Sequence, residues 1–138
     1  MEKVFAKILI AATVICGFTS CDKVENNGKF AGMWQLTEWK HLPDGRIEKG
    51  KESRIYYCVQ LDLMEFRGAG SSYLSRFRRT ADSLLIGTVY HGPKDDIVGY
   101  EELAKYGVPG NGKFALDKLT STSLVLRSDT AQLTFRKF

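Results

Sequence analysis

The sequence predicts an all-β domain, in which an antiparallel meander closes into a small barrel of about eight strands. Polar and apolar side chains alternate along most of the chain after Phe30, which is the period of a strand with one buried face. Short runs of turn-forming residues separate these segments, so consecutive strands pair as antiparallel neighbours. We expect closure because a barrel leaves no sheet edge exposed.

The first strand lies in "GMWQLTEW", where strict alternation places Trp34 and Trp39 on opposite faces. Pro43, Asp44 and Gly45 then predict a turn. The longest alternating run, "RIYYCVQLDLMEF" at residues 54–66, is expected to be one strand. Its inward face would carry Ile55, Tyr57, Val59, Leu61 and Leu63.

The second half continues the pattern. After the glycines at 68 and 70, "SYLSRFRR" predicts a strand with Tyr73 and Phe77 on one face, and "TADS" at 80–83 predicts a hairpin turn. "LLIGTVYH" is the next strand, and "SLVLRS" and "AQLTFRKF" are the last two. Residues 95–112 break the rhythm: they contain the pattern of a short helix at 100–105 and form either a long connection or a lid.

Residues 1–20 have the features of a secretory signal peptide. Lys3 and Lys7 precede an apolar run of about eleven residues, which is short for a membrane-spanning helix. The following "FTSC" resembles the lipobox of bacterial lipoproteins, and this resemblance implies a diacylglyceryl thioether and an acylated amine on Cys21. An ordinary secreted protein and a simple membrane helix are the alternatives.

The lipoprotein interpretation divides the chain into three parts. Residues 1–20 are the signal peptide, residues 21–29 are the lipidated Cys21 and a flexible polar tether, and residues 30–138 are the barrel domain. We expect a monomer in the bacterial cell envelope, held to the outer membrane through the lipid on Cys21. The residues near the anchor, Asp22 and Glu25, leave the periplasmic and surface faces both open.

Composition limits the remaining functions. The net charge of +4 does not indicate nucleic-acid binding. Cys58 is the single cysteine of the predicted domain, and we expect it to be a small buried apolar side chain. His41 and His91 have no second ligand at metal-binding spacing, and we find no catalytic motif, so we expect neither a cofactor, nor a metal, nor an enzyme.

The segment "GMWQL" resembles the Gly-X-Trp signature of lipocalins and other calycins. More narrowly, the order of leader, tether, Gly-X-Trp strand and meander resembles the small lipocalin-like lipoproteins common in Bacteroidetes. The resemblance implies that Gly32 and Trp34 lie at the closed end of the barrel. It also implies that a basic residue of the last strand packs over Trp34, for which Arg136 is the first choice and Arg127 the second.

Two functions stay open. In the first, the barrel binds a small, partly apolar molecule against inward side chains, for which the candidates are Tyr57, Leu61, Tyr73, Phe77, Tyr90 and Leu126. In the second, these side chains fill the barrel, and the protein meets an envelope partner through an apolar patch around Trp39 and Tyr56. The basic cluster of Arg76, Arg78 and Arg79 is either a solvated face or a contact for lipid headgroups or an anionic polymer.

Overall fold

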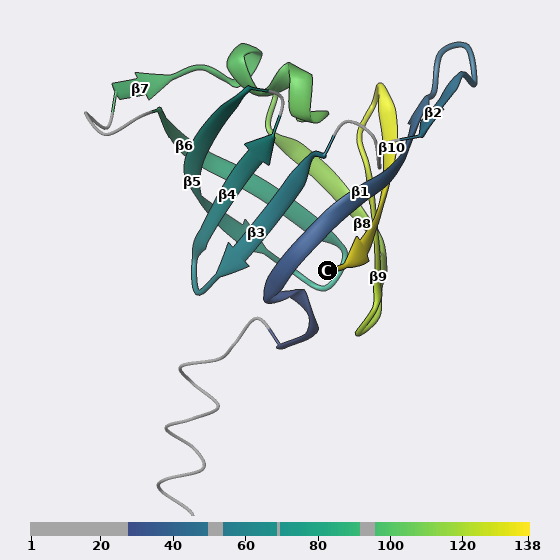
Figure 1. Cartoon of the computed structure of the whole chain (residues 1–138), viewed down its shortest axis with the longest axis horizontal. Coiled ribbons are helices and arrows are strands. Elements are labelled where there is room, and N and C mark those ends of the chain that lie inside the picture. Colours follow the sequence, from purple (N-terminus) through teal and green to yellow (C-terminus); the bar gives the residue numbers. More distant parts are fainter. Residues whose placement is uncertain (1–27, 50–53, 69, 92–95) are drawn as a thin grey trace, which may run out of the picture.

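The computed structural model describes residues 28–49, 54–68, 70–91 and 96–138. Cys21, the predicted signal peptide and the predicted tether up to residue 27 lie outside these residues, so the predictions made for them stay predictions. Within the described chain, eight antiparallel strands form a closed ring, because the last strand pairs with the first (Figure 1). In ring order the strands are β1 (Gly32–His41), β3 (Tyr56–Gln60), β4 (Leu63–Gly68), β5 (Ser71–Arg79), β6 (Ser83–His91), β8 (Lys113–Leu119), β9 (Ser123–Arg127) and β10 (Ala131–Lys137).

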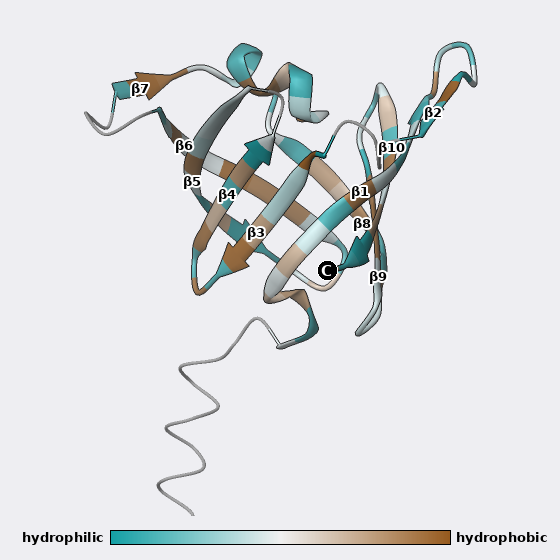
Figure 2. Ribbon diagram, viewed as in Figure 1, coloured by the Kyte–Doolittle hydropathy of each residue, from teal (hydrophilic) through white to brown (hydrophobic). Residues whose placement is uncertain are grey.

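The predicted all-β meander and its closure into a barrel are therefore confirmed. Two short strands add to the ring: β2 (Ile47–Lys49) pairs with the end of β1, and β7 (Asp96–Val98) pairs with the end of β6. The alternation of hydrophobic and hydrophilic residues along the ring strands is visible in Figure 2. It follows from one face of each strand packing into the barrel.

Each end of the barrel is covered by a short 3-10 helix. At the N-terminal end, η1 (Gly28–Phe30) leads into β1, beside the β3–β4 and β5–β6 turns. At the other end, called the helix end below, η2 (Tyr100–Tyr106) lies across the opening. The short helix expected at residues 100–105 is thus present. Strands β2, β7 and β8 had no clear alternation in the sequence and were not predicted.

The expected single strand at residues 54–66 is wrong. The chain turns back at Leu61 and Asp62, and β3 pairs with β4 in a hairpin with Gln60 opposite Leu63. Leu61 has φ of 55°, a value that leucine rarely adopts. Asp62 is the one typical turn residue here, without a Gly, Pro or Asn beside it, and the polar–apolar alternation runs unbroken through the turn, so the pattern favours one strand over two.

Bulges change the faces of several side chains. In β1 the register shifts between Leu36 and Glu38, so Trp39 lies opposite the buried Leu133 and faces inward like Trp34. The predicted opposite faces for the two tryptophans are therefore wrong. In the β5–β6 pair the register shifts between Ser75 and Phe77, and Tyr90 then lies opposite the exposed Leu74. A bulge adds one residue, and with a period of two this moves every later side chain to the other face.

Candidate functional site

The barrel interior is filled by large side chains. Tyr57 is 1% exposed, and its ring centre lies 4.7 Å from that of Phe66 and 4.7 Å from that of Phe135. Leu126 is fully buried, and Phe77, 7% exposed, meets Phe30 edge-on at 5.5 Å. These side chains fill the interior by packing closely against one another, as is usual in a small barrel.

At the helix end, η2 inserts Leu103 and Tyr106 into the opening, and both side chains are fully buried. The Tyr106 hydroxyl lies 2.7 Å from the carbonyl oxygen of Gly68 and 2.5 Å from that of Ser71, and its single proton is available to either acceptor. In return, the Tyr57 hydroxyl donates to the Tyr106 carbonyl at 2.7 Å. Burial raises the pKa of both phenols, that of Tyr57 well above its ordinary value. The two tyrosines thus lock the helix to the barrel wall.

At the N-terminal end, the predicted floor has a different cation. Trp34 is fully buried, and its indole N–H donates to the Phe30 carbonyl at 2.9 Å. The ammonium of Lys137 lies 4.4 Å from the Trp34 ring centre and donates to the carbonyls of Lys29 and Ala31. Arg136, predicted for this position, instead donates to the Gln35 side chain at 2.8 Å.

The second choice for this cation, Arg127, is also wrong: it pairs with Asp117 at 2.9 Å on the exposed surface. The predicted cation, Arg136, and the observed one, Lys137, are neighbours in β10. The register between β1 and β10 places Lys137 directly opposite Trp34. Gly32 has the expected structural place in this floor. Its φ is 122°, and a Cβ added at this position would lie only 3.0 Å from Lys137 Nζ, so there is little room for a side chain.

The structure places four of the six predicted ligand residues inside the barrel and two outside. Tyr57, Tyr73, Phe77 and Leu126 are buried in the core. Leu61 is 51% exposed in the β3–β4 turn, and Tyr90 lies on the outer wall with Leu74 and Ile97 as its cross-strand neighbours. The expected inward orientation of these two residues is therefore wrong, because a hairpin and a bulge intervene.

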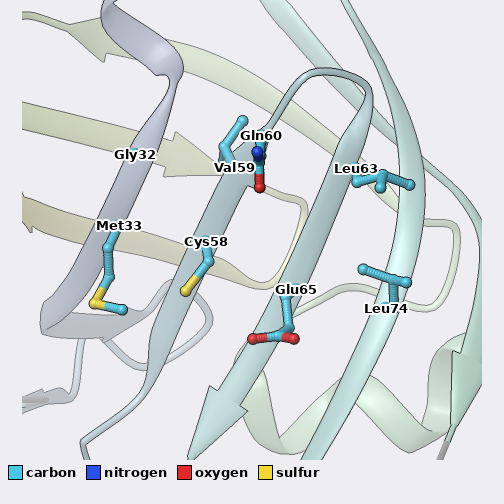
Figure 3. Close-up of a pocket in the computed structure, with 8 residues that line it drawn as sticks. All are labelled: Gly32, Met33, Cys58, Val59, Gln60, Leu63, Glu65 and Leu74. Atoms are coloured by element: carbon cyan, nitrogen blue, oxygen red, sulfur yellow. The ribbon is translucent and has the colours of Figure 1, made fainter. Parts of the chain in front are cut away.

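A different set of side chains comes together on the outer wall. Cross-strand register aligns one row across six strands, which we call the outer-wall row: Met33, Cys58, Glu65, Leu74, Tyr90 and Ile97. A groove of about 470 Å³ opens along part of it, as Figure 3 shows, with Leu63 and Gln60 also at its border. Leu74 is 38% exposed and Ile97 is 72% exposed, so the row offers apolar surface to its surroundings on β5 and β7, while its other members are half-buried.

Glu65 is the single charged member of the row, and its carboxylate forms an ion pair with the guanidinium of Arg67 at 2.7 Å. Cys58 lies beside this ion pair as a half-buried thiol, where burial raises its pKa in spite of the opposing field of Arg67. A raised pKa keeps the thiol protonated and poorly nucleophilic. Sequence reasoning missed the row because it depends on the register of five strand pairs, and register cannot be read from one strand alone.

Among the described residues, no group of three His, Cys, Asp or Glu side chains gathers in a way that would hold a metal ion. His41 is held near Glu48 at 3.3 Å and stacks on Trp39 at 5.4 Å between ring centres. None of the helices in this part of the chain is both long enough and apolar enough to cross a bilayer.

The fold and the Gly-X-Trp floor define a class, the small lipocalin-like barrels. A model of the lipocalin-like domain family matches residues 16–138, and the chain belongs to this family. A lipocalin-like protein from Bacteroides uniformis is similar in structure, with a TM-score of 0.60 and 23% identity over 80% of this chain and 99% of that one.

Two further solved structures share the fold. An uncharacterised protein from Bacteroides eggerthii has a TM-score of 0.52 and 24% identity, covering 78% of this chain and 98% of its own. A protein from Burkholderia xenovorans has a TM-score of 0.55 and 15% identity, covering 78% and 81%. At these identities the similarity establishes the fold alone. A search among curated proteins found no match.

Proposed function

We propose that the chain is a non-enzymatic lipoprotein of the bacterial envelope, anchored to the outer membrane through lipid on Cys21, which binds a partner protein through the outer-wall row. The observation that carries this proposal is the row itself: Leu74 on β5 and Ile97 on β7 expose apolar surface on either side of Tyr90 on β6. Aromatic and aliphatic side chains in one contiguous patch are the usual centre of a protein interface.

The packing of the interior supports this choice over ligand storage. Tyr57, Phe66 and Phe135 contact one another where a ligand would lie. Both ends are covered as well, by Phe30 and by Tyr106, which are each fully buried. A ligand pocket is normally open and largely formed before binding. An outer surface needs no such rearrangement.

Site-specific photo-crosslinking in the native envelope tests the proposed partner. A photo-crosslinking amino acid at Leu74 or Ile97 is expected to yield one defined crosslinked protein, because these positions lie on the row. The matched control is Ile47, which is 50% exposed on β2, away from the row. Absence of a crosslinked species from both row positions, or an identical pattern from Ile47, contradicts the proposal.

A second candidate is binding of a small, partly apolar molecule inside the barrel after η2 withdraws. The tyrosine hydroxyls at the helix end favour it, because withdrawal of η2 would free the hydroxyl of Tyr57 to orient a polar group of a ligand. Native mass spectrometry of the protein purified from its host tests this function. A stoichiometric co-purified molecule that is lost from a Leu126→Trp variant supports it, and bare protein in every preparation opposes it.

A further inference from the structure

We infer that the N-terminal end of the barrel is a docking surface for an anionic lipid bilayer, on which Leu61 and Leu85 enter the interface and Arg78 contacts headgroup phosphates. This inference rests on the proposed anchoring at Cys21, and it adds an orientation: the N-terminal end faces the membrane, and the helix end faces away.

Leu61 is the first reason. It sits at the tip of the β3–β4 turn with φ of 55°, where glycine or asparagine would be less strained, and it is 51% exposed. About half of an apolar side chain therefore faces solvent, at a backbone conformation that leucine disfavours. A leucine at the tip of a turn is useful where the tip meets an apolar phase.

The second reason is the hollow beside this turn. It has a volume of about 460 Å³ and lies between the β3–β4 and β5–β6 turns, bordered by Leu61, Leu85, Arg78 and Arg79. Leu85 is 39% exposed and lies directly opposite Arg78 across the β5–β6 pair. Two exposed leucines next to the exposed guanidinium of Arg78 match the layering of a membrane interface, in which phosphates lie just above the acyl chains. Arg79 instead lies over the Phe30 ring, 5.4 Å from its centre.

The third reason is the balance of charge. The carboxylate of Asp62 is already paired with Arg76 at 2.5 Å, whereas that of Asp82 accepts a hydrogen bond from the neutral hydroxyl of Thr80 at 2.9 Å and keeps its charge. Among the described residues, no carboxylate lies within ion-pair distance of Arg78. The exposed Lys29 adds a further positive charge at the same end.

The fourth reason is the reach of the chain. The described structure begins at Gly28, at this end of the barrel, and Cys21 is seven residues earlier. Seven residues span at most about 25 Å when fully extended. A lipid on Cys21 would therefore keep this end within that distance of the bilayer, where even a weak contact is occupied because the effective concentration is high.

Vesicle flotation of a chain beginning at Asp22 isolates the docking surface from the anchor. Such a chain retains every strand pairing of the ring, since these all lie between Gly32 and Lys137. We expect it to float with vesicles of phosphatidylglycerol mixed with phosphatidylcholine, and much less with phosphatidylcholine alone. Leu61→Asn, which suits the positive φ, and Leu85→Ser should each lower the partition coefficient roughly fivefold. Arg78→Ser should also lower it roughly fivefold.

The matched controls lie at the helix end. Ile97→Ser removes a more exposed apolar side chain, and Arg46→Ser removes an exposed guanidinium, and neither should change the partition coefficient. No flotation up to about 10 mM lipid, equal flotation with both kinds of vesicle, or equal losses from the control variants overturns the inference. A partition coefficient unchanged by all three docking variants, with their thermal unfolding midpoints intact, also overturns it.

The anchor is tested separately by the intact mass of the full chain purified from host membranes. A lipid-sized mass increase that Cys21→Ala abolishes supports the anchor, whatever the flotation result. Flotation of the Asp22 chain without a lipid-sized increase on the full chain leaves the docking surface supported and the anchor refuted. A lipidated full chain whose Asp22 form does not float gives the opposite outcome.

Discussion

Lys137 Nζ lies 4.4 Å from the centre of the Trp34 ring, at the point where the last strand closes on the first. The same ammonium donates hydrogen bonds to the carbonyls of Lys29 and Ala31, which precede Trp34 in the chain. One side chain thus joins the end of β10 to the entry of β1 and caps the indole. The Gly-X-Trp signature therefore has a physical purpose: Gly32 leaves room for the cation that covers Trp34.

Replacing Lys137 by methionine is expected to destabilise the barrel by about 1–3 kcal/mol. Methionine keeps much of the apolar stem but removes the cation–π contact and both hydrogen bonds to carbonyls. Urea unfolding followed by tryptophan fluorescence measures the change. Lys118→Met, at an exposed position on β8, is the control and should unfold at the midpoint of the unaltered chain. Equal midpoints for all three proteins would refute the capping role.

Substitution of Gly32 by alanine tests the same floor from the other side. The new Cβ would meet Lys137 Nζ at 3.0 Å and Lys137 Cδ at 3.2 Å, and the backbone would hold alanine at φ of 122°. We expect a loss of about 2–4 kcal/mol from strain and displacement of the cation. Gly45→Ala also has positive φ but has no atom within 4 Å of its Cβ, so it should cost only about 1 kcal/mol. Thermal unfolding compares the two variants, and equal costs would exclude a role for the Lys137 contact.

Tyr57→Phe should loosen η2 while leaving the barrel closed. The variant loses the 2.7 Å hydrogen bond to the Tyr106 carbonyl and leaves that buried carbonyl short of a donor, at a cost of about 1–3 kcal/mol. Hydrogen exchange is expected to accelerate in residues 103–108 and to stay unchanged in β1 and β10. Tyr90→Phe on the outer wall is the control. Uniform acceleration across all strands would mean that Tyr57 supports the whole barrel rather than the helix end.

The buried phenol also predicts a loss of stability in alkali. Burial raises the pKa of Tyr57 well above the ordinary value of 10.0, so the folded state holds a proton that the unfolded state has released. The free energy of unfolding therefore keeps its full value below pH 10 and falls as the pH rises above 10. Urea midpoints measured on either side of pH 10 should decline in the unaltered chain and decline less in Tyr57→Phe. A parallel decline in both proteins would assign the effect to other groups.

The sequence predicted the ring but not the faces of every side chain. Alternation identifies strands reliably where one face is buried, which is why most of the ring was expected. It fails at Trp39 and Tyr90 because each follows a bulge, and a bulge depends on the pairing of two strands. The same limit explains the error at Arg136, since the partner of Trp34 is decided by the register between β1 and β10.

The candidate site was harder to predict than the fold. Leu74 and Ile97 are far apart in the chain and look like ordinary surface residues until β5, β6 and β7 align them. The turn at Leu61 has only Asp62 as a sequence signal, so a leucine expected inside the barrel lies at the tip of a turn. Interior residues such as Tyr57 and Leu126 were placed correctly, because large apolar side chains are the ones most often buried in a protein core.

The two tryptophans should lose different amounts of stability when each is replaced by phenylalanine. The Trp34 indole N–H donates to the Phe30 carbonyl at 2.9 Å, so Trp34→Phe loses a buried hydrogen bond, apolar contacts and much of the cation–π contact, at a cost of about 2–4 kcal/mol. The Trp39 indole nitrogen is buried, and within the described chain it has no hydrogen-bond partner. Trp39→Phe removes this unsatisfied donor and retains the inward ring, so it should cost less than about 1 kcal/mol. Calorimetric unfolding of both variants measures the difference, and a larger loss at Trp39 would show that its indole has a role the strand pairing does not explain.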